Sequence, residues 1–376
     1  MSILEFIVLK PVKAGVAAVL GIVLGFSAFY AFQLSQTFNE VAVEEFDIER
    51  ARGALSGETP SEVTFVEPDN FEPLPPGVYQ APDLDAEAEA LAEIFDLYEP
   101  FDPVEFSPYS FPSPVPDDVF DAYLMIGTDL SGYRADAVIL GLQPTAGGNP
   151  IMVSLPRDLY VWNVCKGTFT RLNAGLGGCS GVASGPEMMA ILVQDFTGIK
   201  VDHLAIVDFK GFEAVVDALG GTTVCVSYPT RDVASELNIE EAGCHAADGE
   251  MTLAWVRSRK AEHLIDGEWK LVGGSDFTRQ ARQRDVLFQL AGKAAAFPSP
   301  GALTERLQAV ARSVRLDSGW TFGQALSTAW RYRGISKSSV SSFVISVRNY
   351  RTPAGAAVLL PTRYFRDQLE SVYALG

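Results

Sequence analysis

A run of 26 residues between Lys13 and Glu40 carries no charged side chain. Its most apolar part, residues 14–34, is long enough to cross a bilayer, since about 20 apolar residues do so as a helix. Lysines precede the run and acidic residues follow it, so the positive-inside rule places the N-terminus in the cytoplasm. We therefore expect residues 1–13 to be cytoplasmic, residues 14–34 to form a single uncleaved transmembrane helix in the cell membrane, and the rest to be extracytoplasmic. A cleaved signal peptide is the alternative, and it exports the same residues.

The charge of the exported part is unevenly distributed. Residues 40–118 hold 21 acidic and two basic residues, whereas residues 119–376 hold 25 of each sign. The acidic segment also contains 12 of the 22 prolines, which do not fit regular helices or central strands. We interpret residues 35–118 as an extended spacer that holds a domain of residues 119–376 off the membrane; a poorly packed subdomain is the alternative. A net charge of −18 argues against nucleic-acid binding, which needs a basic face.

The domain that begins at residue 119 shows strands interleaved with helices. Ser184 and Pro186 are typical of a helix start and Gly198 of its end, and Asp248 and Asp276 can cap two further helices. Five segments have the pattern of strands, namely 120–126, 137–142, 151–155, 204–207 and 222–226. This order of elements predicts an α/β or α+β sandwich.

Four cysteines in a chain that we expect to be exported favour disulfides. The simplest of the three possible pairings joins sequence neighbours, Cys165 with Cys179 and Cys225 with Cys244. Zinc is disfavoured because no C-x₂₋₄-C spacing is present.

Charged residues gather where the predicted strands end. Asp129 follows the first strand, and Asp136 begins the second, shortly after Arg134. If the two carboxylates meet, they could hold a hard divalent cation such as Mg²⁺; a cap and a turn residue are the alternative. Arg157 and Asp158 directly follow the third strand. An arginine in that position serves either as an anion ligand or in a surface ion pair.

Two further arginine clusters lie later in the chain. In an extended segment alternate residues point the same way, so Arg257 and Arg259 could converge on one anion. On the long predicted helix, Asp276, Arg279 and Gln283 share one face, which continues with the apolar residues Leu287, Leu290 and Ala294. Helix N-termini favour phosphate, and arginine forks match its oxygens. A diphosphate that carries a long lipid would fit this layout; a core-packed helix with a salt-bridged first turn is the alternative.

The order and spacing of these clusters from Phe120 to about Ala296 resemble the LytR-CpsA-Psr family of cell-envelope proteins. The resemblance is carried by residues 124–129, 134–136, 154–158, 171–174, 208–212, 217–221, 249–259 and 276–283. The chain departs from the family pattern at Ala137 and Leu159, where the family more often has Thr after an Asp.

The resemblance implies a three-layer α-β-α sandwich with a mixed central sheet and an apolar pocket for a polyprenyl chain. It also implies a Mg²⁺-dependent phosphotransferase that moves a phosphoglycosyl polymer from a polyprenyl diphosphate carrier to peptidoglycan in cell-wall assembly. Asp129 and Asp136 would hold Mg²⁺. The diphosphate would be lined by Arg134, Arg157, Arg257, Arg259, Arg279 and Gln283, with Asp276 orienting an arginine.

Within that scheme we expect Arg157, Arg257 and Arg279 to matter most for catalysis, and either Asp129 or Asp158 to take the proton of the acceptor hydroxyl. The sequence leaves two alternatives open. One is a hydrolase that acts on the same lipid-linked diphosphate with water as the acceptor. The other is a non-catalytic envelope protein that binds the lipid carrier.

Overall fold

The structure, a computed structural model, describes residues 35–36, 39, 41–55, 114–129, 131–272, 276–295, 308, 310–321, 324, 328, 331 and 337–375, with the side chains of 278–293 in the segment 276–295. The expected transmembrane helix at 14–34 and most of the expected spacer lie outside these residues. Within the described ranges, no helix has both the length and the hydropathy that crossing a bilayer requires. The membrane anchor therefore stays a prediction.

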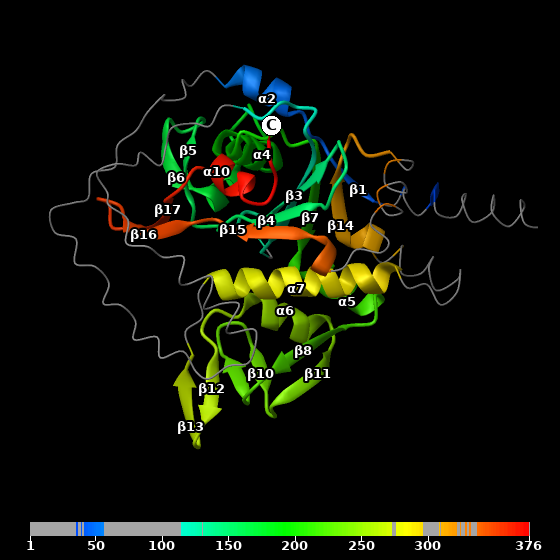
Figure 1. The fold of residues 1–376 in the computed structure, drawn as a ribbon, viewed down its shortest axis with the longest axis vertical. Helices are drawn as coiled ribbons and strands as arrows, with labels where there is room; N and C mark the ends of the chain where they lie inside the picture. The colour runs from blue at the N-terminus through cyan, green and yellow to red at the C-terminus, as the bar shows by residue number, and fades with distance from the viewer. Residues whose placement is uncertain are drawn as a thin grey trace, which may run out of the picture.

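A seven-stranded sheet forms the centre of the fold, in the order β1-β14-β7-β2-β3-β4-β15 (Figure 1). Its strands are Ala42–Glu44 (β1), Phe120–Thr128 (β2), Ala135–Pro144 (β3), Ile151–Ser154 (β4), His203–Asp208 (β7), Val314–Asp317 (β14) and Ser341–Val344 (β15). β2 runs antiparallel to β3 and parallel to β7, so the sheet is mixed, as expected. All five strands that the sequence predicts are present, and four of them are neighbours in this sheet.

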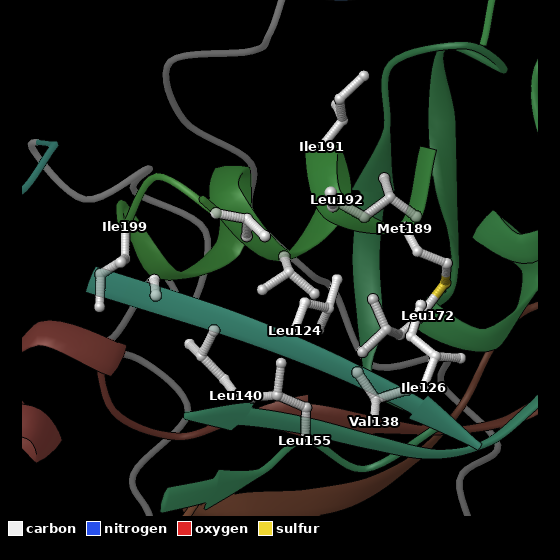
Figure 2. Close-up of a cluster of buried hydrophobic side chains, with 14 of the residues drawn as sticks. Leu124, Ile126, Val138, Leu140, Leu155, Leu172, Met189, Ile191, Leu192 and Ile199 are labelled. Carbon is white, nitrogen blue, oxygen red and sulfur yellow. The ribbon is translucent and has the colours of Figure 1, made fainter. Parts of the chain in front are cut away.

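One face of the sheet packs against helix α4 (Gly185–Thr197). Alternate residues of β2 are buried on this face, and Figure 2 shows Leu124 of the sheet and Met189 of the helix in the same apolar cluster. The side chain of Ser184 caps the first turn of α4, and Gly198 ends the helix in the left-handed conformation at φ 71°. The predicted start and end of this helix are confirmed.

Residues 42–55 belong to the same folded unit, whereas the sequence predicts a spacer there. β1 extends the sheet by pairing with β14, and helix α2 (Ile48–Ala54) packs on α4. Arg50 and Arg52 of α2 form 2.7 Å ion pairs with Glu187 and Asp195 of α4, whose side chains are only 2 % and 13 % exposed. These buried carboxylates need positive partners, and α2 supplies them. The spacer prediction is therefore wrong for residues 42–55.

The opposite face of the sheet lies against helix α7 (Asp276–Ala295), which separates it from a smaller layer (Figure 1). That layer contains α5 (Phe209–Ala218), α6 (Gly249–Arg257) and the paired strands β8 (Thr222–Val226) and β11 (Gly243–Ala247). A four-stranded sheet extends it, formed by β10 (Leu237–Ile239), β9 (Thr230–Asp232), β12 (Glu262–Ile265) and β13 (Glu268–Leu271). Asp248 caps α6, as the sequence predicts.

Two cysteine pairs lie at disulfide distance, Cys165 with Cys179 and Cys225 with Cys244, which is the pairing expected from the sequence. The second pair joins β8 to β11 across their ladder. The remaining elements are β5 (Tyr160–Asn163), β6 (Thr168–Arg171), the short helices η1 (Leu172–Gly177) and η2 (Lys337–Ser339), β16 (Val347–Arg351), β17 (Ala357–Pro361) and α10 (Phe365–Glu370).

Candidate functional site

Charged residues meet at one edge of the central sheet, where β2 and β4 end and β3 begins. Arg157, which follows β4, donates from Nη1 to Asp136 near the start of β3. Its Nε lies 3.6 Å from Asp158, and Asp158 lies 3.4 Å from Nε of Arg171. The side chains of Arg157, Asp136 and Asp158 are 23–24 % exposed. We call these four residues the strand-end cluster; its ion pairs fix both guanidiniums while leaving one side open to solvent.

The loop between β2 and β3 carries Asp129. The backbone amide of Asp129 donates to the carbonyl oxygen of Arg134 at 3.1 Å, and its Oδ1 accepts from the backbone amide of Ser131 at 3.1 Å. These bonds close the loop into a turn from which the side chain of Arg134 reaches solvent. Within the described residues, Oδ2 of Asp129 receives no hydrogen bond.

The two loop carboxylates fit the chemistry of Mg²⁺. Asp129 uses Oδ1 to hold Ser131, and Asp136 uses Oδ1 to hold Arg157, so each carboxylate keeps a second oxygen for a cation. Mg²⁺ is usually bound by one or two carboxylates together with substrate phosphates rather than by a cage of protein ligands. In the described part of the chain, no three His, Cys, Asp or Glu side chains converge on a metal site. A cation held here would need phosphate oxygens to complete its coordination.

A second group of arginines lies where α6 meets α7. Arg257 is the last residue of α6, and its guanidinium lies over the ring of Phe209, 4.5 Å from the centroid. The prediction of an extended segment is therefore wrong for Arg257, although Ser258 is extended. Arg259 follows with an exposed side chain. The two guanidiniums are thus positioned by a helix end and a loop rather than by strand alternation.

Asp232 fixes this helix end, and the sequence analysis missed it. It is 2 % exposed, and its Oδ2 accepts from the hydroxyl of Ser258 and from the amides of Arg259 and Lys260, each at 2.8 Å. Burial alone would raise the pKa of Asp232, but these hydrogen bonds and one from Ala234 outweigh burial and lower it. The contacts join residues about 26 positions apart, so no local motif could reveal them.

The predicted face of α7 lies against α5 and α6. Arg279 is 4 % exposed, Gln283 donates to the carbonyl of Val256 at 3.4 Å, and Leu290 is buried in a cluster shared with α5 and α6. The side chain of Asp276 lies outside the described residues. Leu290 therefore packs in the helix layer, as the alternative of a core-packed helix expects, whereas the expected role of Gln283 at a diphosphate stays a prediction.

The apolar space lies instead on the sheet face that α7 covers. A cavity of about 330 Å³ is lined almost wholly by apolar surface. Its walls include Met125, Gly141, Met152, Ala205 and Trp320. Met125 of β2 pairs with Ala205 of β7, so a small residue stands beside a long one and leaves room above the sheet. The cavity lies against β2, β3 and β4, the strands whose ends carry the strand-end cluster.

The structure thus sorts the predicted residues into two groups. Asp136, Arg157 and Asp158 are brought into direct contact, with Asp129 and Arg134 in the adjoining loop. Arg257, Arg259, Arg279 and Gln283 belong to the α6–α7 junction. The groups are linked by Arg284 of α7, which donates to Ser154 Oγ of β4 at 3.2 Å. Arg284 is a second residue that sequence reasoning missed.

Comparisons with known proteins agree with this architecture. A solved structure of a LytR-Csp2A-Psr enzyme from Actinomyces oris superimposes with a TM-score of 0.56 at 26% identity, over 69% of this chain and 95% of that one. A probable cell wall biosynthesis protein, LcpB of Corynebacterium glutamicum, is 33% identical over 47% of this chain and 37% of its own length. TagU of Bacillus anthracis, a polyisoprenyl-teichoic acid–peptidoglycan teichoic acid transferase, is 27% identical over 51% of this chain and 58% of its own.

The matches thus span about two fifths of the length of LcpB and about three fifths of the length of TagU. The model of the LytR_cpsA_psr family matches residues 120–368, well over half of the chain. This range includes the strand-end cluster, the α6–α7 junction and every described wall of the cavity. The chain therefore belongs to the LytR_cpsA_psr family.

Proposed function

We propose that this protein is a transferase that moves a phosphoglycosyl polymer from a polyprenyl diphosphate carrier to peptidoglycan. The observation that carries the proposal is one sheet face with an apolar cavity at one end and arginines with carboxylates at the other. A lipid-linked diphosphate needs both environments in that order, since its chain is apolar and its head is anionic. The names of LcpB and TagU, a cell-wall biosynthesis protein and a teichoic acid transferase, support the same class of reaction.

The carrier would lie with its chain in the cavity and its diphosphate between the strand-end cluster and the α6–α7 junction. Arg157 would offer the donors that Asp136 and Asp158 leave free, and Arg257, Arg259 and Arg279 would bind from the opposite side, with Arg134 reaching in from its loop. Guanidinium forks suit phosphate oxygens in a way that an ammonium does not. Mg²⁺ held by Asp129 and Asp136 would neutralise part of the diphosphate charge.

Transfer would begin with attack of a peptidoglycan hydroxyl on the phosphorus nearest the glycan. The new P–O bond joins the polymer to the wall, the bond to the bridging oxygen breaks, and polyprenyl phosphate leaves with its electron pair. The arginines would stabilise the charge that develops on the phosphate oxygens. Either Asp129 or Asp158 would accept the hydroxyl proton: Asp158 is engaged by Arg157 and Arg171, and Asp129 would serve through the oxygen that does not hold Ser131 when that oxygen is not bound to the cation.

The test is to incubate the full-length protein with a radiolabelled lipid-linked glycan and purified peptidoglycan. Label that becomes bound to the wall supports the transferase. Label released only into solution indicates a hydrolase, and label that stays on the lipid although the carrier binds indicates a non-catalytic protein.

We also propose that residues 14–34 anchor the protein in the cell membrane with the domain outside. Protease added to intact spheroplasts should then digest the domain and leave a membrane-bound N-terminal fragment. Release of the whole domain from cells at a size that lacks residues 1–40 would instead indicate a cleaved signal.

A further inference from the structure

Arg284 has no role in the reaction proposed above, although it lies between the apolar cavity and the strand-end cluster. It lies near the middle of α7, and its Nη1 donates to Ser154 Oγ at 3.2 Å. Ser154 is the last residue of β4 and is 1 % exposed. Its side chain points to the α7 side of the sheet, because the alternate residues Ile151 and Val153 are buried on the α4 side. The guanidinium of Arg284 is thus held between helix and sheet.

The guanidinium has no anionic partner in the part of the chain that the structure describes. Its one described hydrogen bond goes to a neutral hydroxyl, and no described carboxylate lies within ion-pair distance. By contrast, Arg157 contacts two carboxylates, and Arg50 and Arg52 of α2 each contact one. A cation withdrawn from water without a counter-charge is costly. Burial accordingly lowers the pKa of Arg284.

Nε and Nη2 of Arg284 make no hydrogen bond within the described residues, and they are not fully sealed from solvent, unlike the indole nitrogens of Trp162 and Trp320. An arginine that is largely withdrawn from water, lacks a carboxylate partner and has donors left unpaired has the properties of an anion ligand.

The position of Arg284 along the sheet indicates which part of a bound lipid-linked diphosphate would contact it. Met152, two residues before Ser154, is on the wall of the apolar cavity. Arg157, three residues after Ser154, belongs to the strand-end cluster. At about 3.3 Å per residue of strand, the cavity wall at Met152 lies about 7 Å from Ser154 on one side, and on the other side the chain leaves β4 and turns at Arg157. Arg284 therefore stands where a bound lipid would change from chain to head.

We infer that Arg284 binds the chain-side phosphate of the polyprenyl diphosphate, and so stabilises the polyprenyl phosphate that departs in the transfer step. The inference rests on the proposed function. It assigns the two phosphates to different arginines, with the strand-end cluster at the glycan-side phosphate and Arg284 at the phosphate that keeps the lipid. As the bridging P–O bond breaks, the electron pair moves to the oxygen of the chain-side phosphate, next to this guanidinium.

The test measures binding of three probes that share one chain, namely geranylgeranyl diphosphate, geranylgeranyl monophosphate and geranylgeraniol, by titration calorimetry with the full-length protein. In Arg284→Gln we expect affinity for both phosphates to fall about 10- to 100-fold, the usual effect of losing hydrogen bonds to a charged group. Affinity for the neutral alcohol should not change. Arg284→Lys should recover part of the loss, and Arg366→Gln, an exposed arginine paired with Glu370 on α10, should match the wild type.

Ser154→Ala distinguishes two roles of Arg284, a phosphate ligand and a structural clamp that holds α7 to β4. It removes the hydrogen bond between α7 and β4 but keeps the guanidinium. Near-normal phosphate binding in Ser154→Ala, with the loss confined to Arg284→Gln, supports the inference. Equal losses for all three probes, or the same loss in Ser154→Ala, would show a clamp and overturn it. Wild-type binding by Arg284→Gln, with diphosphate binding lost in Arg157→Gln, overturns the inference but leaves the proposed function standing. If the wild type binds none of the probes, the proposed carrier site fails, and the inference fails with it.

Discussion

The strand-end cluster and the α6–α7 junction hold their arginines in opposite ways. In the cluster, Arg157 and Arg171 contact carboxylates on side chains, so much of their charge is already compensated. At the junction, Arg257 stacks on Phe209 and Arg282 on Trp255, with centroid distances of 4.5 and 3.9 Å. An aromatic face orients a guanidinium without neutralising it.

This difference suggests separate contributions to a diphosphate site. Paired arginines are fixed before the ligand arrives, but each ligand oxygen must compete with a carboxylate. Stacked arginines keep their full positive charge, and they rely on the fold to hold the segment that carries them. Removing a residue should therefore have different consequences in the two regions.

Arg157→Ala should have the largest effect, a loss of turnover on the order of 10²–10³, comparable to removal of an oxyanion donor. The substitution deletes a phosphate ligand, leaves Asp136 without its guanidinium and leaves Asp158 with Arg171 alone, so the site becomes more negative toward an anionic substrate. Turnover of labelled lipid-linked glycan measures the effect, with Arg351→Ala as a control at an exposed arginine. Wild-type turnover in Arg157→Ala would place the reaction elsewhere on the protein.

Loss of the metal should come next. Asp129→Asn and Asp136→Asn each retain the shape of the side chain but weaken cation binding, so turnover should fall steeply while the thermal unfolding midpoint changes little. A chelator should reproduce the loss in the wild type, and added Mg²⁺ should restore it. Full activity in chelator, with both substitutions silent, would contradict the metal site.

The sequence predicts well what depends on neighbouring residues. The strands β2, β3 and β4, the cap of α4 at Ser184 and the cap of α6 at Asp248 all have local signals. Because these strands are adjacent, the placement of Asp136, Arg157 and Asp158 at one sheet edge follows from the same signals. The predicted cysteine pairing agrees with the structure because each pair is close in sequence.

What the sequence does not predict depends on contacts between distant elements. Periodicity identifies the faces of α7 but not which layer each one meets, and the face of Gln283 packs on α6 while Arg284, one residue later, reaches the sheet. Residues 42–55 are acidic like the rest of the segment, but they contain both of its arginines, Arg50 and Arg52, and none of its prolines. The segment folds through contacts with distant elements, namely the pairing of β1 with β14 and the ion pairs of Arg50 and Arg52 with carboxylates of α4 more than 130 positions away.

Arg257→Lys tests the stacked region and should have a smaller effect, a loss of turnover of about tenfold or somewhat more. The ammonium keeps the charge but cannot lie flat over Phe209 or offer two parallel donors. The measurement is turnover with separate kcat and KM, compared with Arg257→Ala. If Arg257→Lys works as well as the wild type, charge alone suffices at this position and the stacked geometry is irrelevant.

Asp232→Asn should have the smallest effect on the reaction, because this residue acts only by holding the end of α6. An amide in place of the carboxylate leaves some of the donors from Ser258, Arg259 and Lys260 without a good acceptor, which should lower the free energy of unfolding by about 1–3 kcal/mol at pH 7.

The pKa of Asp232 is lowered in the folded state from its ordinary value of 3.8. The stabilisation by its carboxylate is therefore complete above that value and is lost as the pH falls through the lower folded pKa. Urea unfolding at several pH values should therefore show a constant gap between wild type and variant down to about pH 4 and a shrinking gap below it. The gap would not change with pH if Asp232 were protonated in the folded protein. The value of kcat/KM should fall only a few-fold, through a higher KM. The arginines themselves remain, and only the backbone that positions them becomes less rigid.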